Sequence, residues 1–440
     1  MGTGYKRAAM AGKGQAQDTI FALASASGRA GVAVIRLSGP DAEPIARALS
    51  GGRPLPARRA VLRTLRRAGE VLDEAVLIHF PAPGSFTGED VVELQGHGSA
   101  AVIEAVSAAL LALGARQAGP GEFTRRAVEN GRMDLTEAEG LLDLIDAQTQ
   151  GQRRQALSQM EGALRRSYEG WRDGLLDALA SVEGEIDFPD EDDVPDALAH
   201  RAWPHLQGVI DDITGALARA ERGRAVRNGI DIAIIGAPNA GKSTLLNRLA
   251  GREAAIVSPV PGTTRDVVEV PMVIAGLPVT LSDTAGLRDT QDSVEAEGVR
   301  RARRRAEAAS LRIGLARGDD PLPDLQDGDI ALRNVEGTPG PDAVNALSGA
   351  GVDALVERLE GVIRERFAGH ESAGLTRARH ADLARRALEA ARRAQRHLGT
   401  APELAGEDIR AALRALDELA GRADIEDVFD RIFSQFCIGK

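Results

Sequence analysis

The fold of the middle of this chain is decided by one stretch, Gly236-Ala237-Pro238-Asn239-Ala240-Gly241-Lys242-Ser243. A mostly apolar run, 230–235, precedes it, and a helix-like segment, 244–250, follows it and ends at Gly251. Strand, glycine loop and helix in this order are the context that the phosphate-binding pattern G-x-x-x-x-G-K-S requires. Glycines let backbone N–H groups approach a phosphate, and the N-terminus of the helix adds partial positive charge. The stretch therefore predicts a phosphate-binding loop; the alternative is an ordinary glycine-rich turn.

The two polar residues that end this loop have separate expected roles. Lys242 is expected to reach the outer phosphates, and the Ser243 hydroxyl is expected to bind Mg²⁺. Lysine usage supports this, since the chain has four lysines, at positions 6, 13, 242 and 440, among 54 basic residues. A chain this rich in arginine has a lysine where a compact point charge suits phosphate better than a guanidinium fork.

Composition limits what the chain can be. A net charge of −11 excludes binding of nucleic acid by an overall basic surface, so any such site is local. The single cysteine, Cys437, excludes an internal disulfide framework and suits a reducing cytosol. No run of about 18 apolar residues occurs, so no membrane span is predicted, and we expect a cytoplasmic protein.

The pattern along the chain predicts a multidomain protein. At 440 residues the length favours about three domains. Residues 1–17 are small and polar, and we expect them to form a disordered tail. Within the first domain we predict strands at 31–37, 71–80 and 91–94 and a helix at 100–113. The predicted domains are an α+β N-terminal domain at 18–133, an α-helical domain at 134–225 and 371–440, and a P-loop α/β domain at 226–370 that interrupts it.

Two motifs after the phosphate-binding loop indicate the class of enzyme. The sequence Pro261-Gly262-Thr263-Thr264-Arg265-Asp266 supplies Thr264, which can close over a γ-phosphate and complete the Mg²⁺ shell. Two apolar runs, 268–275 and 277–281, predict a hairpin that leads into Asp283-Thr284-Ala285-Gly286. Asp283 can hold Mg²⁺ through water, and the Gly286 N–H can contact the γ-phosphate. The ordered set predicts a GTPase of the Ras-like P-loop class.

The motif expected to recognise a guanine base is incomplete. An Asn-Lys-x-Asp pattern would follow a later strand, and the chain has Asn334-Val335-Glu336-Gly337 at that place. Asn334 is present, but valine and glycine occupy the lysine and aspartate positions. We therefore expect weakened guanine selectivity, which Val335→Lys together with Gly337→Asp would restore; alternatively, Glu336 or Asp342 recognises the base. Residues 344–347 resemble the last base-contacting loop.

With these motifs in place, the chain resembles the tRNA modification GTPase family MnmE (TrmE) over nearly all of residues 18–440. The most specific matches are Ser85-Phe86-Thr87-Gly88-Glu89-Asp90, Pro120-Gly121-Glu122-Phe123-Thr124, Asp187-Phe188-Pro189, Asp283-Thr284-Ala285-Gly286-Leu287-Arg288 and Cys437-Ile438-Gly439-Lys440. The resemblance implies a homodimer formed through the N-terminal domains, and a heterotetramer with an FAD-containing partner, MnmG. Such proteins together install an aminomethyl-type group (carboxymethylaminomethyl) at C5 of the wobble uridine of certain tRNAs, using GTP and a reduced folate, either 5-formyl- or methylene-tetrahydrofolate.

The resemblance also assigns residues to sites. It implies folate-binding residues at Arg36, Glu93, Arg132 and Lys440, a K⁺ site at Asn239, Ser258, Val260 and Thr263, Mg²⁺ ligands at Ser243 and Thr264, and nucleotide contacts at Asn239, Ala240, Gly241, Lys242, Ser243, Thr244, Ser258, Thr263, Thr264, Asp283, Thr284, Ala285, Gly286 and Asn334. Arg132 stands where the family usually has lysine, which keeps the charge but alters its geometry. Ser258 and Pro261 likewise replace a usual threonine and alanine.

The group that orients the attacking water lies outside the usual motif. Leu287 directly follows Gly286 and cannot orient water. Glu295 matches the residue that does so in the family, although by itself it resembles a solvated carboxylate at a helix start. A K⁺ ion near the bond between the β- and γ-phosphates can supply the charge that an arginine finger supplies in other GTPases. Cys437 is either a catalytic nucleophile or an inert small residue that packs the terminus.

Two other functions fit part of the sequence. A GTP switch of the ribosome-assembly kind shares the phosphate-binding loop but lacks the N-terminal domain and the Cys-Ile-Gly-Lys tail. A hydrolysis-impaired dimeric scaffold is suggested by the incomplete base motif. Folate binding separates our prediction from the first, and a hydrolysis assay separates it from the second.

Overall fold

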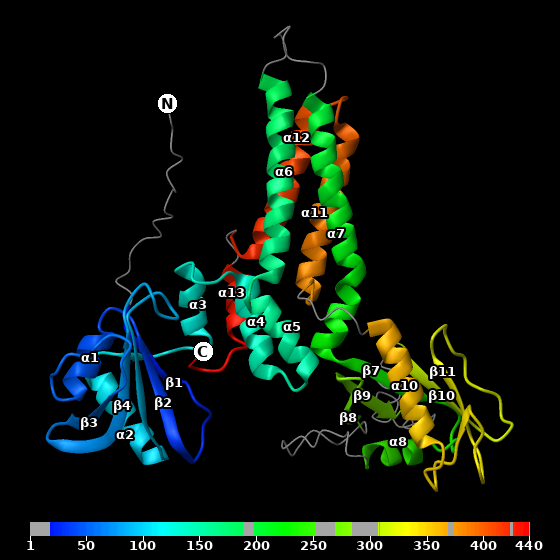
Figure 1. Cartoon of the computed structure of the whole chain (residues 1–440), viewed down its shortest axis with the longest axis horizontal. Coiled ribbons are helices and arrows are strands. Elements are labelled where there is room, and N and C mark those ends of the chain that lie inside the picture. The colour runs from blue at the N-terminus through cyan, green and yellow to red at the C-terminus, as the bar shows by residue number, and fades with distance from the viewer. Residues whose placement is uncertain are drawn as a thin grey trace, which may run out of the picture. The chain divides into compact units, whose positions relative to one another are not determined.

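The computed structural model describes residues 18–187, 198–251, 269–283, 307, 309–367, 374–422 and 426–439. These residues fall into two compact units (Figure 1). The first unit consists of residues up to 138 together with 424–440, and the second consists of 139–423. Each unit has its own six-stranded sheet and its own buried core.

The first unit is an α+β domain built on a sheet of strand order β3-β4-β5-β2-β1-β6. Neighbouring strands are antiparallel except β1 and β6, which are parallel. Helices α1 and α2 cover the sheet and share its apolar core. The elements are β1 (Ile20–Leu23), β2 (Ala30–Ser38), α1 (Ala42–Leu49), β3 (Val61–Arg67), β4 (Glu70–Phe80), β5 (Val91–Gly98), α2 (Ala100–Ala112), β6 (Arg116–Gln117), α3 (Glu122–Glu129) and α13 (Glu426–Phe433).

The strands and the helix predicted for this domain are confirmed. The predicted strands 31–37, 71–80 and 91–94 lie in β2, β4 and β5. Helix α2 begins after Ser99, whose hydroxyl oxygen accepts a hydrogen bond from the Val102 N–H, as expected for an N-cap serine. The helix stops just before Gly114, which has a left-handed φ of 97° that favours glycine.

The C-terminal segment differs from the predicted domain assignment. The sequence predicted that all of 371–440 belongs to the helical domain, but residues 426–439 pack with the N-terminal unit. Phe433 and Phe436 are buried there, and Ile438 forms an isolated antiparallel bridge with Pro120. Helix α13 of this segment packs on α3.

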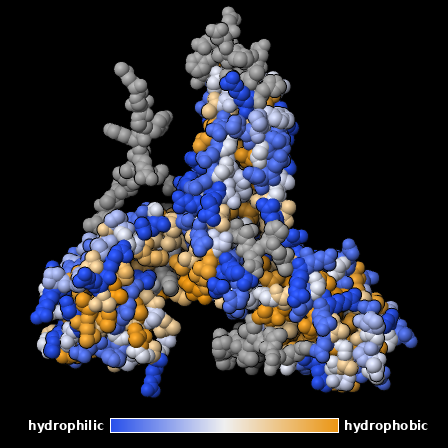
Figure 2. All heavy atoms as spheres, in the orientation of Figure 1, coloured by the Kyte–Doolittle hydropathy of each residue, from blue (hydrophilic) through white to orange (hydrophobic). Residues whose placement is uncertain are grey.

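The second unit begins as a bundle of helices. α6 packs on α7, α11 packs on α12, and each pair contacts the other. Buried alanines on α11 and α12, such as Ala387 and Ala412, let these two helices approach closely. On the face shown in Figure 2 the bundle presents mainly hydrophilic residues. The helices are α4 (Leu135–Asp146), α5 (Gln150–Met160), α6 (Ala163–Asp187), α7 (Leu198–Asn228), α11 (Ala378–His397) and α12 (Pro402–Ala420).

Across the described residues, no helix is both long enough and apolar enough to cross a membrane.

A buried ionic cluster holds α4 against α11. Glu139 on α4 accepts hydrogen bonds from His380 Nε2 at 2.6 Å and from Arg379 Nη2 at 3.1 Å. The side chains of Glu139 and His380 are 2% and 0% exposed. Burial alone would raise the pKa of Glu139, but the charges of Arg379 and Arg377 and the hydrogen bond from His380 outweigh it and hold the pKa well below its usual value. Burial lowers the pKa of His380 against the attraction of Glu139.

A second carboxylate extends this cluster to α7. Asp143 on α4 accepts hydrogen bonds from Arg227 Nε at 2.9 Å and from Arg377 Nη2 at 2.7 Å. Arg227 lies at the end of α7, just before the chain enters the second sheet, and Arg377 lies just before α11, where the chain has returned. Gln152 on α5 also donates to the Arg227 carbonyl at 2.9 Å. Asp143 therefore ties together the two ends of the inserted α/β part.

The inserted part is a mostly parallel sheet of order β12-β11-β10-β7-β9-β8, in which only β8 runs antiparallel to its neighbour. The predicted hairpin is confirmed as β8 and β9, and the predicted α/β class is confirmed with it. The elements are β7 (Ile230–Ile235), α8 (Lys242–Ala250), β8 (Glu269–Ile274), β9 (Leu277–Asp283), β10 (Leu311–Arg317), β11 (Ile330–Asn334), β12 (Ala343–Val344) and α10 (Val352–Phe367).

The two faces of this sheet differ. The apolar residues of β7, β10 and β11 that point to one face pack with α8 and α10. The connections 318–329 and 335–342 contain no helix, and Leu325 and Pro323 of the first lie against Gly314 instead. A Cβ at Gly314 would lie 2.8 Å from Leu325 Cδ2, so the glycine lets this short connection pack on the strand.

Strand β10 was not predicted from the sequence, because the stretch 311–329 is poor in β-branched residues. In the structure it lies between β7 and β11 and is buried along Leu311, Ile313 and Leu315. Pairing with two flanking strands and packing against a helical layer therefore outweigh the weak local preference for strand conformation, as is common for central strands.

The buried His380 predicts how stability depends on pH. Its pKa is lower in the folded chain than in the unfolded chain, where it is about 6.5. Below that pH the unfolded state binds a proton that the folded state does not, so the free energy of unfolding should fall by up to about 1.4 kcal/mol per pH unit. His380→Gln should remove this dependence between pH 7.5 and 5.5. Urea unfolding followed by tryptophan fluorescence measures it, since both tryptophans, Trp171 and Trp203, lie in the bundle.

The matched control is His205→Gln on α7, where the imidazole is largely exposed. This variant should keep the pH dependence of the wild type. An equal pH dependence of the free energy of unfolding in wild type and His380→Gln would contradict the role assigned to His380.

Candidate functional site

The phosphate-binding loop lies at the centre of the second sheet. Strand β7, which leads into it, is flanked by β9 on one side and β10 on the other. The chain passes first to β8 and β9, then to β10, β11 and β12 on the opposite side of β7. Ligands of open α/β sheets bind beyond the carboxyl ends of strands at such a switch point. The loop after β7 therefore occupies the position where this fold binds ligands.

The two glycines of the loop are required by close backbone approach. Gly236 has a φ of 154°, and a Cβ there would lie 2.1 Å from the Leu315 carbonyl oxygen. Gly241 has a φ of 98°, and a Cβ there would lie 2.3 Å from Asn334 Nδ2. Asn239 has a φ of 65°, in the left-handed region that asparagine tolerates. The predicted glycine loop is thus formed as the pattern requires.

Three side chains converge beside the loop. Lys242 Nζ donates to the carbonyl oxygens of Gly236 and Ala237, both at 2.9 Å. Burial lowers the pKa of Lys242, and the charge of Asp283 opposes that shift. The Ser243 hydroxyl donates to the Asp283 carboxylate, at the end of β9. A hydroxyl and a carboxylate oxygen are donors that suit Mg²⁺, so these residues fit the predicted metal position.

The Asn334 side chain bridges two loops by hydrogen bonds. Its Nδ2 donates to the Ala240 carbonyl at 2.9 Å, and its Oδ1 accepts from the Ala346 N–H at 3.1 Å. These hydrogen bonds join the phosphate-binding loop to the loop that follows β12. Thr244, in the first turn of α8, is half-buried beside these groups.

A second cluster lies in the first unit, on β2 and β5. Arg36 donates to Glu93 Oε1 through Nη2 at 3.0 Å and through Nε at 3.2 Å, and each side chain is 17% exposed. The Arg36 guanidinium also lies 5.5 Å from the Phe86 ring and 5.9 Å from the Phe123 ring. Arg132 contacts the same loop as Phe86, because a Cβ at Gly88 would lie 3.3 Å from its Cγ. Three of the four predicted folate positions therefore meet around the loop 85–90.

Residues 135–437 match the family described as the MnmE helical domain, and residues 19–132 match the one described as the GTP-binding protein TrmE N-terminus. The chain belongs to the MnmE family. Among its relatives, proteins named tRNA modification GTPase MnmE are 56% identical in Maricaulis maris, 50% in Caulobacter vibrioides and 51% in Parvibaculum lavamentivorans. Each match covers 96% of this chain and 99–100% of the relative.

MnmE membership confirms the resemblance seen in the sequence. It also confirms the predicted enzyme class, a GTPase that acts in tRNA modification. The phosphate-binding loop, Lys242 and the Ser243–Asp283 pair lie together, an arrangement that is compatible with this class.

Several predicted MnmE site residues lie outside the described residues. They are Ser258, Val260, Thr263, Thr264, Thr284, Ala285, Gly286, Glu295 and Lys440. Their roles stay predictions, and so does the K⁺ site, of which only Asn239 is described.

The tail that carries Cys437 is held against the start of α3. The Gly121 N–H points at the Cys437 carbonyl at 3.5 Å, and Ile438 pairs with Pro120. Gly439 has a φ of 101°, and a Cβ there would lie 2.2 Å from the Leu23 carbonyl oxygen. Cys437 itself is exposed and forms no disulfide. The tail therefore presents an accessible thiol on the unit that carries the Arg36–Glu93 cluster.

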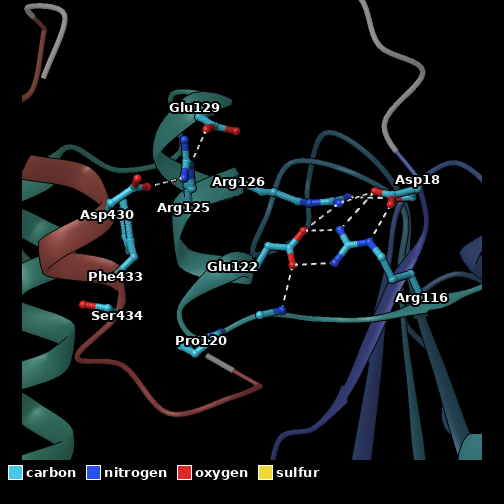
Figure 3. A pocket seen from close by; sticks show the side chains of 11 residues that line it. Asp18, Arg116, Pro120, Glu122, Arg125, Arg126, Glu129, Asp430, Phe433 and Ser434 are labelled. Atoms are coloured by element: carbon cyan, nitrogen blue, oxygen red, sulfur yellow. Dashed lines mark hydrogen bonds and ion pairs between the residues drawn. The ribbon is translucent and has the colours of Figure 1, made fainter. Parts of the chain in front are cut away.

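Ion pairs brace α3 beside this tail (Figure 3). Arg125 on α3 binds Asp430 on α13 at 2.9 Å and Glu129 at 2.9 Å. Arg126 is 6% exposed and binds Asp18 and Glu89. A pocket of about 480 Å³ opens between these groups, and all seven of its charged lining residues have an ion-pair partner within the unit. The charges around this pocket therefore stabilise the packing of α3 and α13, and none of them is free to bind a ligand.

Two polar clusters of the first unit, 85–90 and 120–132, contact each other. Part of the first is structural, since Ser38 donates to Glu89 at 2.5 Å and its hydroxyl lies 2.7 Å from that of Thr87. Burial of Arg126 against Glu89 then joins the two clusters. No pattern in the sequence distinguishes a buried arginine from an exposed one here.

The Lys242 geometry predicts a selective loss of binding. Lys242→Ala removes the only described side-chain cation at the phosphate-binding loop, and a hydrogen bond to a charged group is worth about 10–100-fold in affinity. Titration with a fluorescent GDP analogue measures the change.

The control for this experiment is Lys13→Ala, the same substitution in the N-terminal segment, which should bind like wild type. Wild-type affinity in Lys242→Ala would show that the loop does not hold the phosphates. Urea unfolding of both variants checks that the fold is intact.

Proposed function

We propose that this chain hydrolyses GTP with Mg²⁺ and K⁺ as a step in modifying the wobble uridine of certain tRNAs. The observation that carries the proposal is the convergence of Lys242, Ser243 and Asp283 at the phosphate-binding loop. Lys242 now donates to two backbone carbonyls and would exchange them for phosphate oxygens. Ser243 would hold Mg²⁺ directly and Asp283 would hold it through water, with Thr264 completing the shell. The ion would neutralise charge that develops on the transferred phosphoryl group.

Two further residues take part in hydrolysis in this proposal. Asn239 is exposed at the phosphate-binding loop, from which its side chain can bind K⁺ together with Ser258, Val260 and Thr263. That cation would supply the charge that an arginine finger supplies in other GTPases. Glu295 would orient the attacking water, because Leu287 occupies the place after Gly286 and cannot.

The Arg36–Glu93 cluster supports folate binding. A reduced folate has carboxylates and a polar ring edge, and a half-buried arginine beside a carboxylate can bind both kinds of group. Arg132 and Lys440 would add two more charges. The one-carbon unit of the folate and an FAD-containing partner, MnmG, would then build an aminomethyl-type group, such as carboxymethylaminomethyl, at C5 of the uridine. The exposed Cys437 is available as a nucleophile in that chemistry.

The proposal includes partners and a place of action. We infer a homodimer through the N-terminal domains, a heterotetramer with MnmG, and action on tRNA in the cytoplasm. The scaffold alternative is weakened by the intact Lys242 and Ser243–Asp283 geometry. The switch alternative is weakened by the Arg36–Glu93 cluster, which hydrolysis does not need.

Hydrolysis provides the first test of the proposed function. K⁺ should accelerate GTP hydrolysis over Na⁺, and Asn239→Ala should erase the difference. Glu295→Ala should leave GTP binding intact and slow hydrolysis by roughly 10–10³-fold, the scale of losing a group that positions a proton transfer. Steady-state phosphate release in the two salts measures both effects. Equal hydrolysis rates in K⁺ and Na⁺ would contradict the proposed K⁺ site. An unchanged hydrolysis rate in Glu295→Ala would contradict the role proposed for Glu295.

Folate binding provides the second test. Arg36→Ala should weaken binding of 5-formyl-tetrahydrofolate by about 10–100-fold, because one charged hydrogen-bond donor is lost. Isothermal titration calorimetry on the full chain measures it. Arg66→Ala is the matched control, since Arg66 is exposed on β3. Absence of folate binding in wild type would favour the pure GTP switch.

A further inference from the structure

The loops after β11 and β12 lie where the base of a bound nucleotide must lie. Asn334, at the end of β11, is hydrogen-bonded to Ala240 of the phosphate-binding loop and to Ala346 after β12. Arg248 on α8 donates to the carbonyl oxygens of Ala346 and Leu347. Ligands of such sheets lie along the carboxyl ends of the strands. A nucleotide whose phosphates occupy the loop after β7 therefore extends its base toward these two loops.

The amide side chains of these loops are committed to holding the loops together. Asn334 uses its Nδ2 on Ala240 and its Oδ1 on Ala346. Asn345 uses its Nδ2 on the Gly337 carbonyl at 3.3 Å and its Oδ1 on the Ser348 N–H at 3.0 Å. Both amides therefore act between loops, and a base would have to displace them to use them.

The two carboxylates between residues 334 and 348 are directed at arginines. Glu336 binds Arg317, at the end of β10, at 3.2 Å and is 88% exposed. Asp342 binds Arg358, on α10, at 2.6 Å and is 74% exposed. Guanine is selected when a desolvated carboxylate accepts its ring and amino N–H groups, because an acceptor in water discriminates little. In this structure both acids are paired with arginines instead, so neither is directed at a base.

The backbone at Gly337 also opposes an acidic side chain. Its φ is 108°, a conformation that residues with a Cβ rarely adopt. The loop is thus built for glycine at the place where the complete motif has aspartate. Gly337→Asp would strain the loop, so the replacement that the sequence suggested as a repair is not expected to work.

We propose that this site binds purine nucleotides with little selection for guanine. The proposal rests on the proposed nucleotide-binding function and specifies its substrate class. Guanine presents its N1–H and its N2 amino group to such an acceptor, hypoxanthine presents only N1–H, and adenine has neither group. Since both acids of the described loops 335–348 are paired with arginines, these differences between the bases should change affinity little, and affinity should come mainly from the phosphates and the metal. GDP and IDP should bind within about 10-fold of each other, and GDP and ADP within about 100-fold.

Competition binding on the full chain tests this. A fluorescent GDP analogue with Mg²⁺ is displaced by GDP, IDP or ADP, and the three dissociation constants are compared. Lys242→Ala should weaken all three alike, which shows that they share one site. A preference for GDP over ADP beyond about 100-fold would overturn the proposal and leave the nucleotide function standing. Failure of wild type to bind any of the three would overturn both.

Variants of the loop complete the test. Glu336→Gln and Asp342→Asn should leave the ratios between the three nucleotides unchanged. A fall in guanine preference in either variant would identify the recognising acid and overturn the proposal. Gly337→Asp should weaken binding of all three nucleotides through strain, whereas selective tightening of GDP would overturn the argument from the backbone.

Discussion

The insertion of the α/β part into a helical domain depends on charges buried where the insertion begins and ends. Asp143 binds Arg227, which precedes β7, and Arg377, which precedes α11. Glu139, one turn earlier on α4, binds Arg379 and His380. Removing one partner of a buried pair leaves an uncompensated charge, at a cost of about 3–5 kcal/mol. The cluster therefore fixes where the chain leaves the bundle and where it returns.

The local parts of the nucleotide site could be predicted from the sequence, because glycine and apolar residues determine them over short distances. Gly236 and Gly241 adopt backbone conformations that suit glycine, and the hairpin delivers Asp283 to Ser243 as the spacing of its apolar runs suggested. The three predicted N-terminal strands are confirmed for a similar reason, since each is an apolar run bounded by turn residues.

Features that depend on distant partners could not be predicted. Strand β10 has a weak local preference and becomes a strand because β7 and β11 flank it. The C-terminal helix α13 was expected to belong to the helical domain, and only the fold shows that its partner is α3. Arg126 is buried because Asp18 and Glu89, which are far from it in sequence, supply opposite charges. Such pairings are properties of the tertiary structure.

The bridging role of Asn334 changes how its motif should be interpreted. The Nδ2 and Oδ1 atoms of this amide bind two different loops, so the asparagine stabilises the phosphate-binding loop against its neighbour. An asparagine in that position is consequently a marker of loop architecture, and a sequence can retain it while losing the chemistry that distinguishes one base from another. Assignments of nucleotide preference in divergent GTPases gain more from the residue three places later, whose backbone conformation and charge bear directly on the base.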